Sequence, residues 1–120
     1  MCHQTVSLVA RHLESIGITT VVVGSARDIV EEAGVARFLF VDFPLGNPTG
    51  KPGDVEMNRS IVSLALDLAA GAIGARTTLQ APVRWDHDEW RSAFMAVGDH
   101  NRDALREAGE RRRSHQAARQ

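Results

Sequence analysis

The sequence predicts an α/β fold of the Rossmann-like kind, in which helices flank a parallel sheet. Helical and strand patterns alternate along the first part of the chain, and two segments, 18–23 and 38–43, are apolar runs with almost no polar alternation. Such runs, rich in β-branched or aromatic residues, are typical of strands that helices cover on both faces. The short connections between helix, strand, helix and strand indicate a βαβ unit with a right-handed crossover.

The composition limits the class of protein. Of the 120 residues, 43% are hydrophobic and 24% are charged, which is the profile of one globular domain and excludes a disulfide-rich scaffold. The net charge of −1 gives no reason to expect a membrane or nucleic-acid partner. Segment 102–120 carries six arginines against three acids, but no aromatic residue lies among them to stack on bases. A single cysteine cannot form an internal disulfide, so we expect a cytoplasmic protein.

The first helix is predicted over residues 4–16, because apolar residues recur at spacings of three and four. The residues that this spacing places on one stripe of the helix are Val6, Val9, Leu13 and Ile16. Gly17 is the residue expected just past the helix end. After the first strand, Ser25 is expected to cap a short helix over 26–33, which Gly34 closes.

A loop rich in proline and glycine, residues 44–54, follows the second strand. Open α/β sheets bind ligands beyond the carboxyl ends of their strands, so this loop is a candidate site for an anionic substrate. The candidate substrate-binding residues are Gly46, Asn47, Thr49 and Lys51. A rigid surface loop without a ligand is the alternative. A nucleotide phosphate loop is disfavoured, because two glycines stand one position too close and Pro52 follows Lys51.

The rest of the chain is predicted to be mainly helical. One helix covers 55–72, and segment 74–83 is a connector with room for a short third strand. Beyond it lies a further helical pattern with an apolar stripe of Trp90, Phe94 and Val97. The acids of 86–89 flank a single histidine and suit the start of a helix, so we expect no metal site.

Two strong strands are too few for the sheet that these patterns describe. Both have the pattern of central strands, yet a two-stranded parallel sheet leaves two edges open and cannot bury both faces. A helix such as 4–16 also normally follows a strand in an α/β unit. We therefore expect the missing strands to come from a partner chain or from sequence outside this chain, as in a homo- or hetero-oligomer.

Cys2 and His3 are the candidate reactive residues at the beginning of the chain. Cys2 is expected at the turn into the first helix, where unpaired backbone N–H groups and the helix dipole favour a thiolate. His3 would add positive charge when it is protonated. The alternative is a terminal cysteine without a role.

The sequence Cys-His-Gln-Thr-Val, which begins at Cys2, resembles the selenoprotein B family of glycine, sarcosine, betaine and D-proline reductases. The segments that carry this resemblance are 2–11, 17–21, 24–30, 43–48 and 53–56. Family members are considerably longer, so the chain looks like their C-terminal portion and like an incomplete part of a larger α/β unit. We expect residues 1–85 to form an α/β redox-type domain and residues 86–120 to form a helical extension with a charged tail.

The resemblance implies that Cys2 and His3 are catalytic. In the family a selenocysteine lies three residues before the cysteine that matches Cys2, and such a cysteine can resolve a selenenyl sulfide. We accordingly expect no cofactor in this chain, a selenocysteine upstream of it, and an in-frame UGA two codons before Met1. A pyruvoyl group would belong to a separate partner. The other partners implied are a thioredoxin-like protein and components of a reductase complex.

Two functions follow from these patterns. The first is a fragment or subunit of a reductase that reductively cleaves C–N bonds of amino-acid-like substrates, with Cys2 as the resolving thiol. We expect the isolated chain to be inactive in that role. The second is a non-catalytic α/β interaction module that assembles through its open sheet edges. Enhanced reactivity of Cys2 would favour the first function, and association in solution would favour the second.

Overall fold

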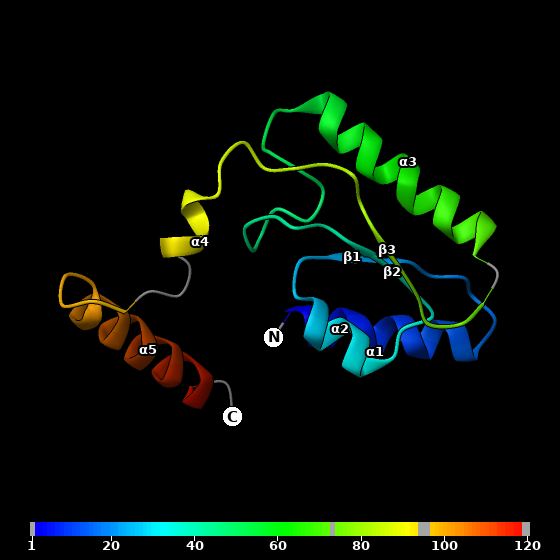
Figure 1. Ribbon diagram of the computed structural model, residues 1–120. Coiled ribbons are helices and arrows are strands. Elements are labelled where there is room, and N and C mark those ends of the chain that lie inside the picture. The colour runs from blue at the N-terminus through cyan, green and yellow to red at the C-terminus, as the bar shows by residue number, and fades with distance from the viewer. Residues whose placement is uncertain (1, 73, 94–96, 119–120) are drawn as a thin grey trace. The chain divides into compact units, whose positions relative to one another are not determined.

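The computed structural model describes residues 2–72, 74–93 and 97–118 (Figure 1). The chain divides into two units, Met1–Asp88 and Glu89–Gln120. The first unit contains a sheet with helices on both sides, and the described part of the second unit contains two helices.

Three parallel strands form the sheet of the first unit. They are β1 (Val22–Gly24), β2 (Arg37–Phe40) and β3 (Thr77–Gln80), and they lie side by side in that order. Phe38 of β2 is in register with Val22 on one side and with Thr78 on the other. The predicted α/β fold class is therefore confirmed. The third strand lies within the predicted connector, and the first two are shorter than the apolar runs that predict them.

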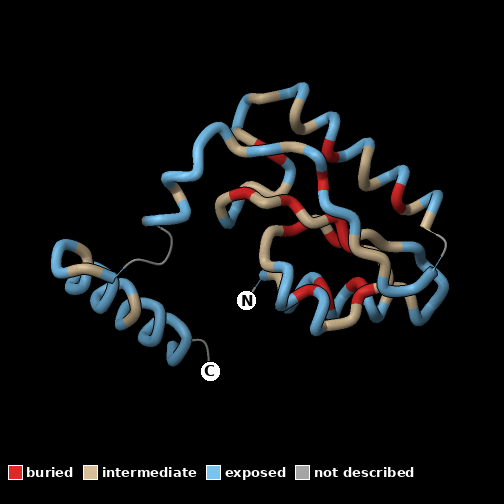
Figure 2. Tube along the Cα trace, in the orientation of Figure 1, coloured by how far each residue is buried: buried red, intermediate tan, exposed pale blue. Residues whose placement is uncertain are grey.

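Helices cover both faces of this sheet (Figure 1). They are α1 (Cys2–Ser15) and α2 (Arg27–Ala33) on one face and α3 (Val55–Gly71) on the other. Successive residues of β2 point to opposite faces, so Phe38 packs with α1 and α2 whereas Leu39 packs with α3. Both residues are buried, and Figure 2 shows that the buried parts of the chain concentrate in the strands and on the inner sides of the helices. Helices thus cover β2 on both faces, as its apolar run predicts.

Two helix ends follow from the local sequence. The Asp54 side chain caps α3 by accepting a hydrogen bond of 3.0 Å from the backbone N–H of Met57. Gly34 ends α2 in the left-handed conformation with φ of 71°, as glycine at this position predicts. On α3, Ile61 and Leu68 are buried in the core against the sheet, which also agrees with the helical periodicity.

The apolar stripe of α1 does not face the core. Val6, Val9 and Ile16 are 45%, 51% and 60% exposed. The side of α1 that packs inward carries Ser7 and Ala10 instead, and both are buried. These small side chains let α1 lie close to α2 and the sheet. The periodicity therefore identified residues that share a side of the chain, and of these only Leu13 is half-buried.

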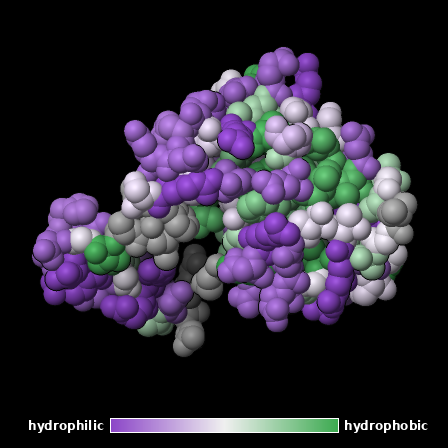
Figure 3. Space-filling model, viewed as in Figure 1, coloured by the Kyte–Doolittle hydropathy of each residue, from purple (hydrophilic) through white to green (hydrophobic). Residues whose placement is uncertain are grey.

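The second unit contains α4 (Glu89–Ala93) and α5 (Arg102–Ala117). No described residue of α5 is buried, and the surface of this helix is largely hydrophilic (Figure 3). Of the predicted apolar stripe, Phe94 lies outside the described residues and Val97 is 64% exposed. Within residues 2–72, 74–93 and 97–118, every helix is too short or too polar to cross a membrane.

Candidate thiol site

Cys2 and His3 lie in the first turn of α1, beside the carboxyl end of β1. The Nε2 atom of His3 accepts hydrogen bonds from the backbone N–H groups of Ser25, at 3.2 Å, and Ala26, at 3.3 Å. Because these two residues link β1 to α2, the imidazole joins the beginning of α1 to the beginning of α2. The contact holds the beginning of α1 against the turn that follows β1.

The beginning of α2 differs from the prediction. Ala26 rather than Ser25 is the N-cap residue, and this cap makes no side-chain hydrogen bond. The predicted Ser25 cap is therefore wrong. His3 Nε2 instead accepts hydrogen bonds from the two N–H groups that stand just before the helix. Those donors would otherwise need water or another acceptor.

Gly24 gives the His3 ring the space that this contact requires. A Cβ atom on Gly24 would lie 2.8 Å from His3 Cδ2 and 2.9 Å from His3 Nε2, closer than real side chains allow. Glycine at the end of β1 is therefore the residue that lets the imidazole approach the following backbone.

The Cys2 thiol lies next to the other ring nitrogen of His3. The distance from Cys2 Sγ to His3 Nδ1 is 3.6 Å, which is within hydrogen-bonding range for sulfur. Cys2 is a free, exposed cysteine and the first residue of α1. The positive end of the helix dipole and the unpaired N–H groups of the first turn favour negative charge there. The arrangement is a solvent-accessible thiol beside an imidazole nitrogen at the beginning of a helix.

Lys51 of the candidate substrate loop contacts the segment that follows β3. Its Nζ atom forms an ion pair with Asp86 and lies 6.0 Å from the centre of the Trp85 ring. Trp85 packs in turn against Phe43, with 5.3 Å between the ring centres. The charge of Lys51 therefore has an acidic neighbour, which competes with any anionic substrate.

The other candidate residues of this loop lie in turns. The backbone N–H of Asn47 donates to the carbonyl of Pro44, and the N–H of Gly50 donates to the carbonyl of Asn47, both at 3.2 Å. Gly46 and Thr49 are exposed. Across the described ranges, 2–72, 74–93 and 97–118, no group of three or more His, Cys, Asp or Glu residues is placed to hold a metal ion.

The two sets of candidate residues make separate contacts along the carboxyl edge of the sheet. His3 contacts the turn after β1, whereas Lys51, in the loop after β2, contacts Asp86 after β3. Gly24 and Asp86 take part in these contacts, although the sequence patterns did not indicate either residue for them. A glycine that ends a β-branched run is a signal for close backbone approach, and it could have identified Gly24. Asp86 carries no such signal, because 35 residues separate it from Lys51.

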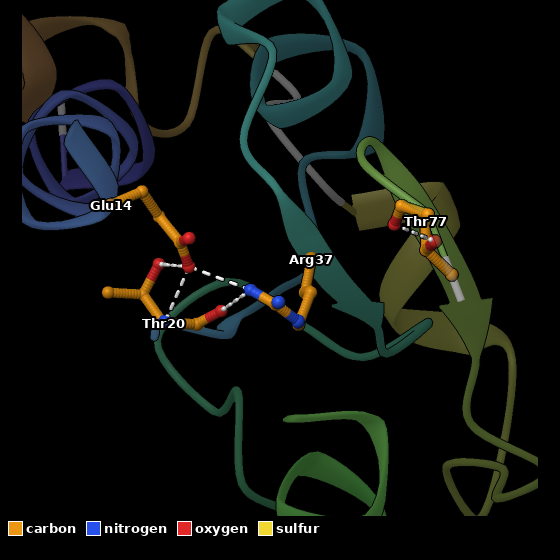
Figure 4. A network of polar contacts seen from close by, with 5 residues as sticks. Glu14, Thr20, Arg37 and Thr77 are labelled. Atoms are coloured by element: carbon orange, nitrogen blue, oxygen red, sulfur yellow. Dashed lines mark hydrogen bonds and ion pairs between the residues drawn. The ribbon is translucent and has the colours of Figure 1, made fainter. Parts of the chain in front are cut away.

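A second polar cluster lies at the amino edge of the sheet (Figure 4). One carboxylate oxygen of Glu14 accepts hydrogen bonds from the Thr20 backbone N–H at 2.6 Å, the Thr20 hydroxyl at 2.9 Å and the Arg37 guanidinium at 2.8 Å. The backbone hydrogen bond from Thr20 is the main cause that lowers the pKa of Glu14. The Thr20 hydroxyl and Arg37 act in the same direction, and partial burial acts against them. This cluster joins the end of α1 to the beginnings of β1 and β2.

Comparison with known proteins finds a distant relative by sequence. No protein-family model and no solved structure matches the chain. D-proline reductase subunit gamma of Acetoanaerobium sticklandii is 29% identical to the chain over 65 residues. The match covers 54% of this chain and 27% of that protein, so the chain matches only about a quarter of the relative's length. The chain is distantly similar to a reductase subunit.

Proposed function

We propose that this chain is the thiol-bearing part of a reductase related to D-proline reductase, and that Cys2 is its redox-active thiol. The observation that carries the proposal is the exposed Cys2 at the beginning of α1, held beside the His3 imidazole at the carboxyl edge of the sheet. The distant similarity to D-proline reductase subunit gamma supports it, as does the resemblance of the Cys-His-Gln-Thr-Val segment to the selenoprotein B family.

In this role Cys2 acts by thiol exchange. Its thiolate attacks one atom of an S–S or Se–S bond, forms a new bond to that atom and displaces the other atom as a thiolate or selenolate. The exchange passes the oxidised bond to Cys2 without a net change in electrons. A second thiolate, from a thioredoxin-like protein, then frees Cys2 by the same reaction. The reductase of which the chain is a part would cleave C–N bonds of amino-acid-like substrates, as the family resemblance implies.

The proposal is tested with cystamine and selenocystamine, a disulfide and a diselenide of the same size. The protein is incubated with each reagent, its intact mass is measured, and reduced thioredoxin is then added. We expect a single adduct on Cys2 from both reagents and its removal by thioredoxin, while the Cys2→Ser variant forms none. A protein that forms no adduct, or an adduct that thioredoxin leaves in place, would contradict the proposed function.

The second candidate function is an interaction module, and the exposed stripe of α1 specifically favours it. Val6 and Val9 are exposed apolar residues on one side of α1, and Ile16 is exposed just past its end; exposed apolar residues of this kind commonly mark contact surfaces. Among the described strands, β1 and β3 are both edge strands of the sheet. Apolar residues also reach the surface of the first unit in Figure 3.

Sedimentation velocity over a range of protein concentrations tests this second function. If the chain is such a module, it should associate with itself, and Val9→Glu should weaken that association. Val30→Ala, on the buried side of α2, is the control for general destabilisation. A chain that stays monomeric at every concentration would contradict assembly with itself through the α1 stripe. The cystamine reaction is measured on the same samples, because Val9→Glu leaves Cys2 and His3 unchanged.

A further inference from the structure

We infer that His3 is a positioning residue for Cys2: the backbone at the beginning of α2 holds the imidazole in the tautomer whose Nδ1–H points at the thiol sulfur. The inference rests on the proposed function only where it gives the thiol a redox role. The geometry itself, and the measurement of the tautomer, are independent of that function.

The tautomer follows from the two backbone donors. Peptide N–H groups can only donate, so the Nε2 atom that meets Ser25 and Ala26 must present its lone pair to them. A proton on Nε2 would point at two other protons and break both hydrogen bonds. The proton of the neutral ring therefore resides on Nδ1.

The Nδ1 proton has the Cys2 sulfur as its neighbour. At 3.6 Å the Nδ1–H can donate to Sγ, and a thiolate accepts such a hydrogen bond better than a thiol does. By fixing the tautomer, the Ser25 and Ala26 N–H groups thus direct the Nδ1–H of the ring at the sulfur. Hydrogen-bond partners set the tautomer of histidines in other sites in the same way. The sequence suggests that a protonated His3 would add positive charge, whereas the geometry assigns His3 a directed Nδ1–H.

Gly24 and the two backbone donors hold the ring in this orientation. The absent Cβ of Gly24 lets the imidazole lie against the backbone, with Cδ2 and Nε2 as its nearest atoms. Consequently the edge of the ring that carries Nε2 faces the sheet, and Nδ1 faces the exposed Cys2 side chain.

Nitrogen NMR of protein labelled with ¹⁵N-histidine tests the tautomer directly. For the neutral His3 ring we expect the proton on Nδ1, and the resonance is assigned by its loss in His3→Gln. A neutral ring that carries its proton on Nε2 would overturn the inference, whatever the redox behaviour of Cys2.

The consequence for the thiol is tested by substitution. His3→Gln keeps a side-chain oxygen that can accept from the Ser25 and Ala26 N–H groups but lacks the Nδ1 donor. We expect the alkylation of Cys2 by iodoacetamide at pH 7 to slow by about two- to tenfold, the effect of one hydrogen bond. An unchanged rate in a folded variant would overturn the inference.

A relocated cysteine provides the matched control. In the variant Cys2→Ser/Ser15→Cys the thiol stands at the opposite, exposed end of α1, away from His3. Adding His3→Gln to this variant should leave the alkylation rate of its relocated thiol unchanged. If His3→Gln slowed alkylation of the relocated thiol as much as that of Cys2, the effect would be a general one on the fold, and the inference would be overturned.

The role of His3 and the proposed function can fail separately. If the tautomer and the Cys2-specific rate effect are found but thioredoxin does not release the cystamine adduct, the proposed function fails while the role of His3 stands.

Discussion

The His3 imidazole lies so close to the backbone of Gly24 that a Cβ atom on this glycine would stand 2.8 Å from His3 Cδ2. Glycine at the end of β1 and histidine at the second position of α1 therefore form one structural unit, although they are far apart in the sequence. The unit connects the position of the only cysteine to the sheet.

Gly24→Ala should displace the His3 ring and break its hydrogen bonds to the backbone. We expect the free energy of unfolding to fall by about 1–3 kcal/mol, the usual cost of overpacking, and Cys2 to lose part of its reactivity. Urea denaturation and alkylation measure the two effects. Gly71→Ala is the control, because a Cβ there meets no atom within 4 Å; equal losses in both variants would contradict this account of Gly24.

Ser7→Ala should leave the protein as stable as before or make it more stable. The Ser7 hydroxyl is fully buried and has no hydrogen-bond partner among the described residues. Removing such a group should gain about 1 kcal/mol of unfolding free energy. Thermal unfolding measures this change in stability. Ser63→Ala, on the exposed side of α3, is the control and reports the gain in stability from helix propensity alone. A marked loss of stability in Ser7→Ala would show that the hydroxyl has a partner.

Acid should weaken the polar cluster of Glu14, Thr20 and Arg37 at the amino edge of the sheet. Since the folded state lowers the pKa of Glu14 below 4.5, its carboxylate contributes stability at neutral pH, and this contribution is lost as the pH falls through the folded pKa. Glu14→Gln should therefore destabilise the protein at pH 7, and the difference from the unaltered chain should shrink near pH 3. A difference that is constant with pH, measured by urea denaturation, would contradict the pairing with Thr20 and Arg37.

The ion pair of Lys51 and Asp86 should contribute little to stability, because the Asp86 side chain is 66% exposed. Lys51→Met and Asp86→Asn should each lower the free energy of unfolding by less than about 1 kcal/mol, with a coupling of about 0.2–1 kcal/mol between them. A double-mutant cycle measures that coupling. If the coupling is zero, the two residues do not hold the loop to the segment after β3.

The fold class could be predicted because strand composition and short connections are local properties. The run at 38–43 indicates a strand covered on both faces, and Phe38 and Leu39 are indeed buried on opposite faces of β2. Gly34 likewise marks a helix end by its own conformational freedom. These features depend on near neighbours in the chain, so the sequence pattern was sufficient.

The inner side of α1 could not be assigned from periodicity. His3, Ser7, Ala10 and Glu14 also recur at spacings of four, three and four, and this second stripe is the one that meets the sheet. Small residues at its centre allow close packing, and polar residues at its two ends bind backbone groups and Arg37. A hydrophobic pattern reports which residues share a side of a helix, but only tertiary contacts decide which side is covered.

The redox role of Cys2 is tested most directly by the second-order rate constant of its thiol with cystamine at pH 7. This rate constant is compared with that of the relocated thiol in Cys2→Ser/Ser15→Cys. If Cys2 is a redox thiol favoured by the beginning of α1 and by the His3 Nδ1–H, its rate constant should be higher by about three- to tenfold. Equal rate constants for the two thiols would contradict the claim and leave Cys2 an ordinary exposed cysteine.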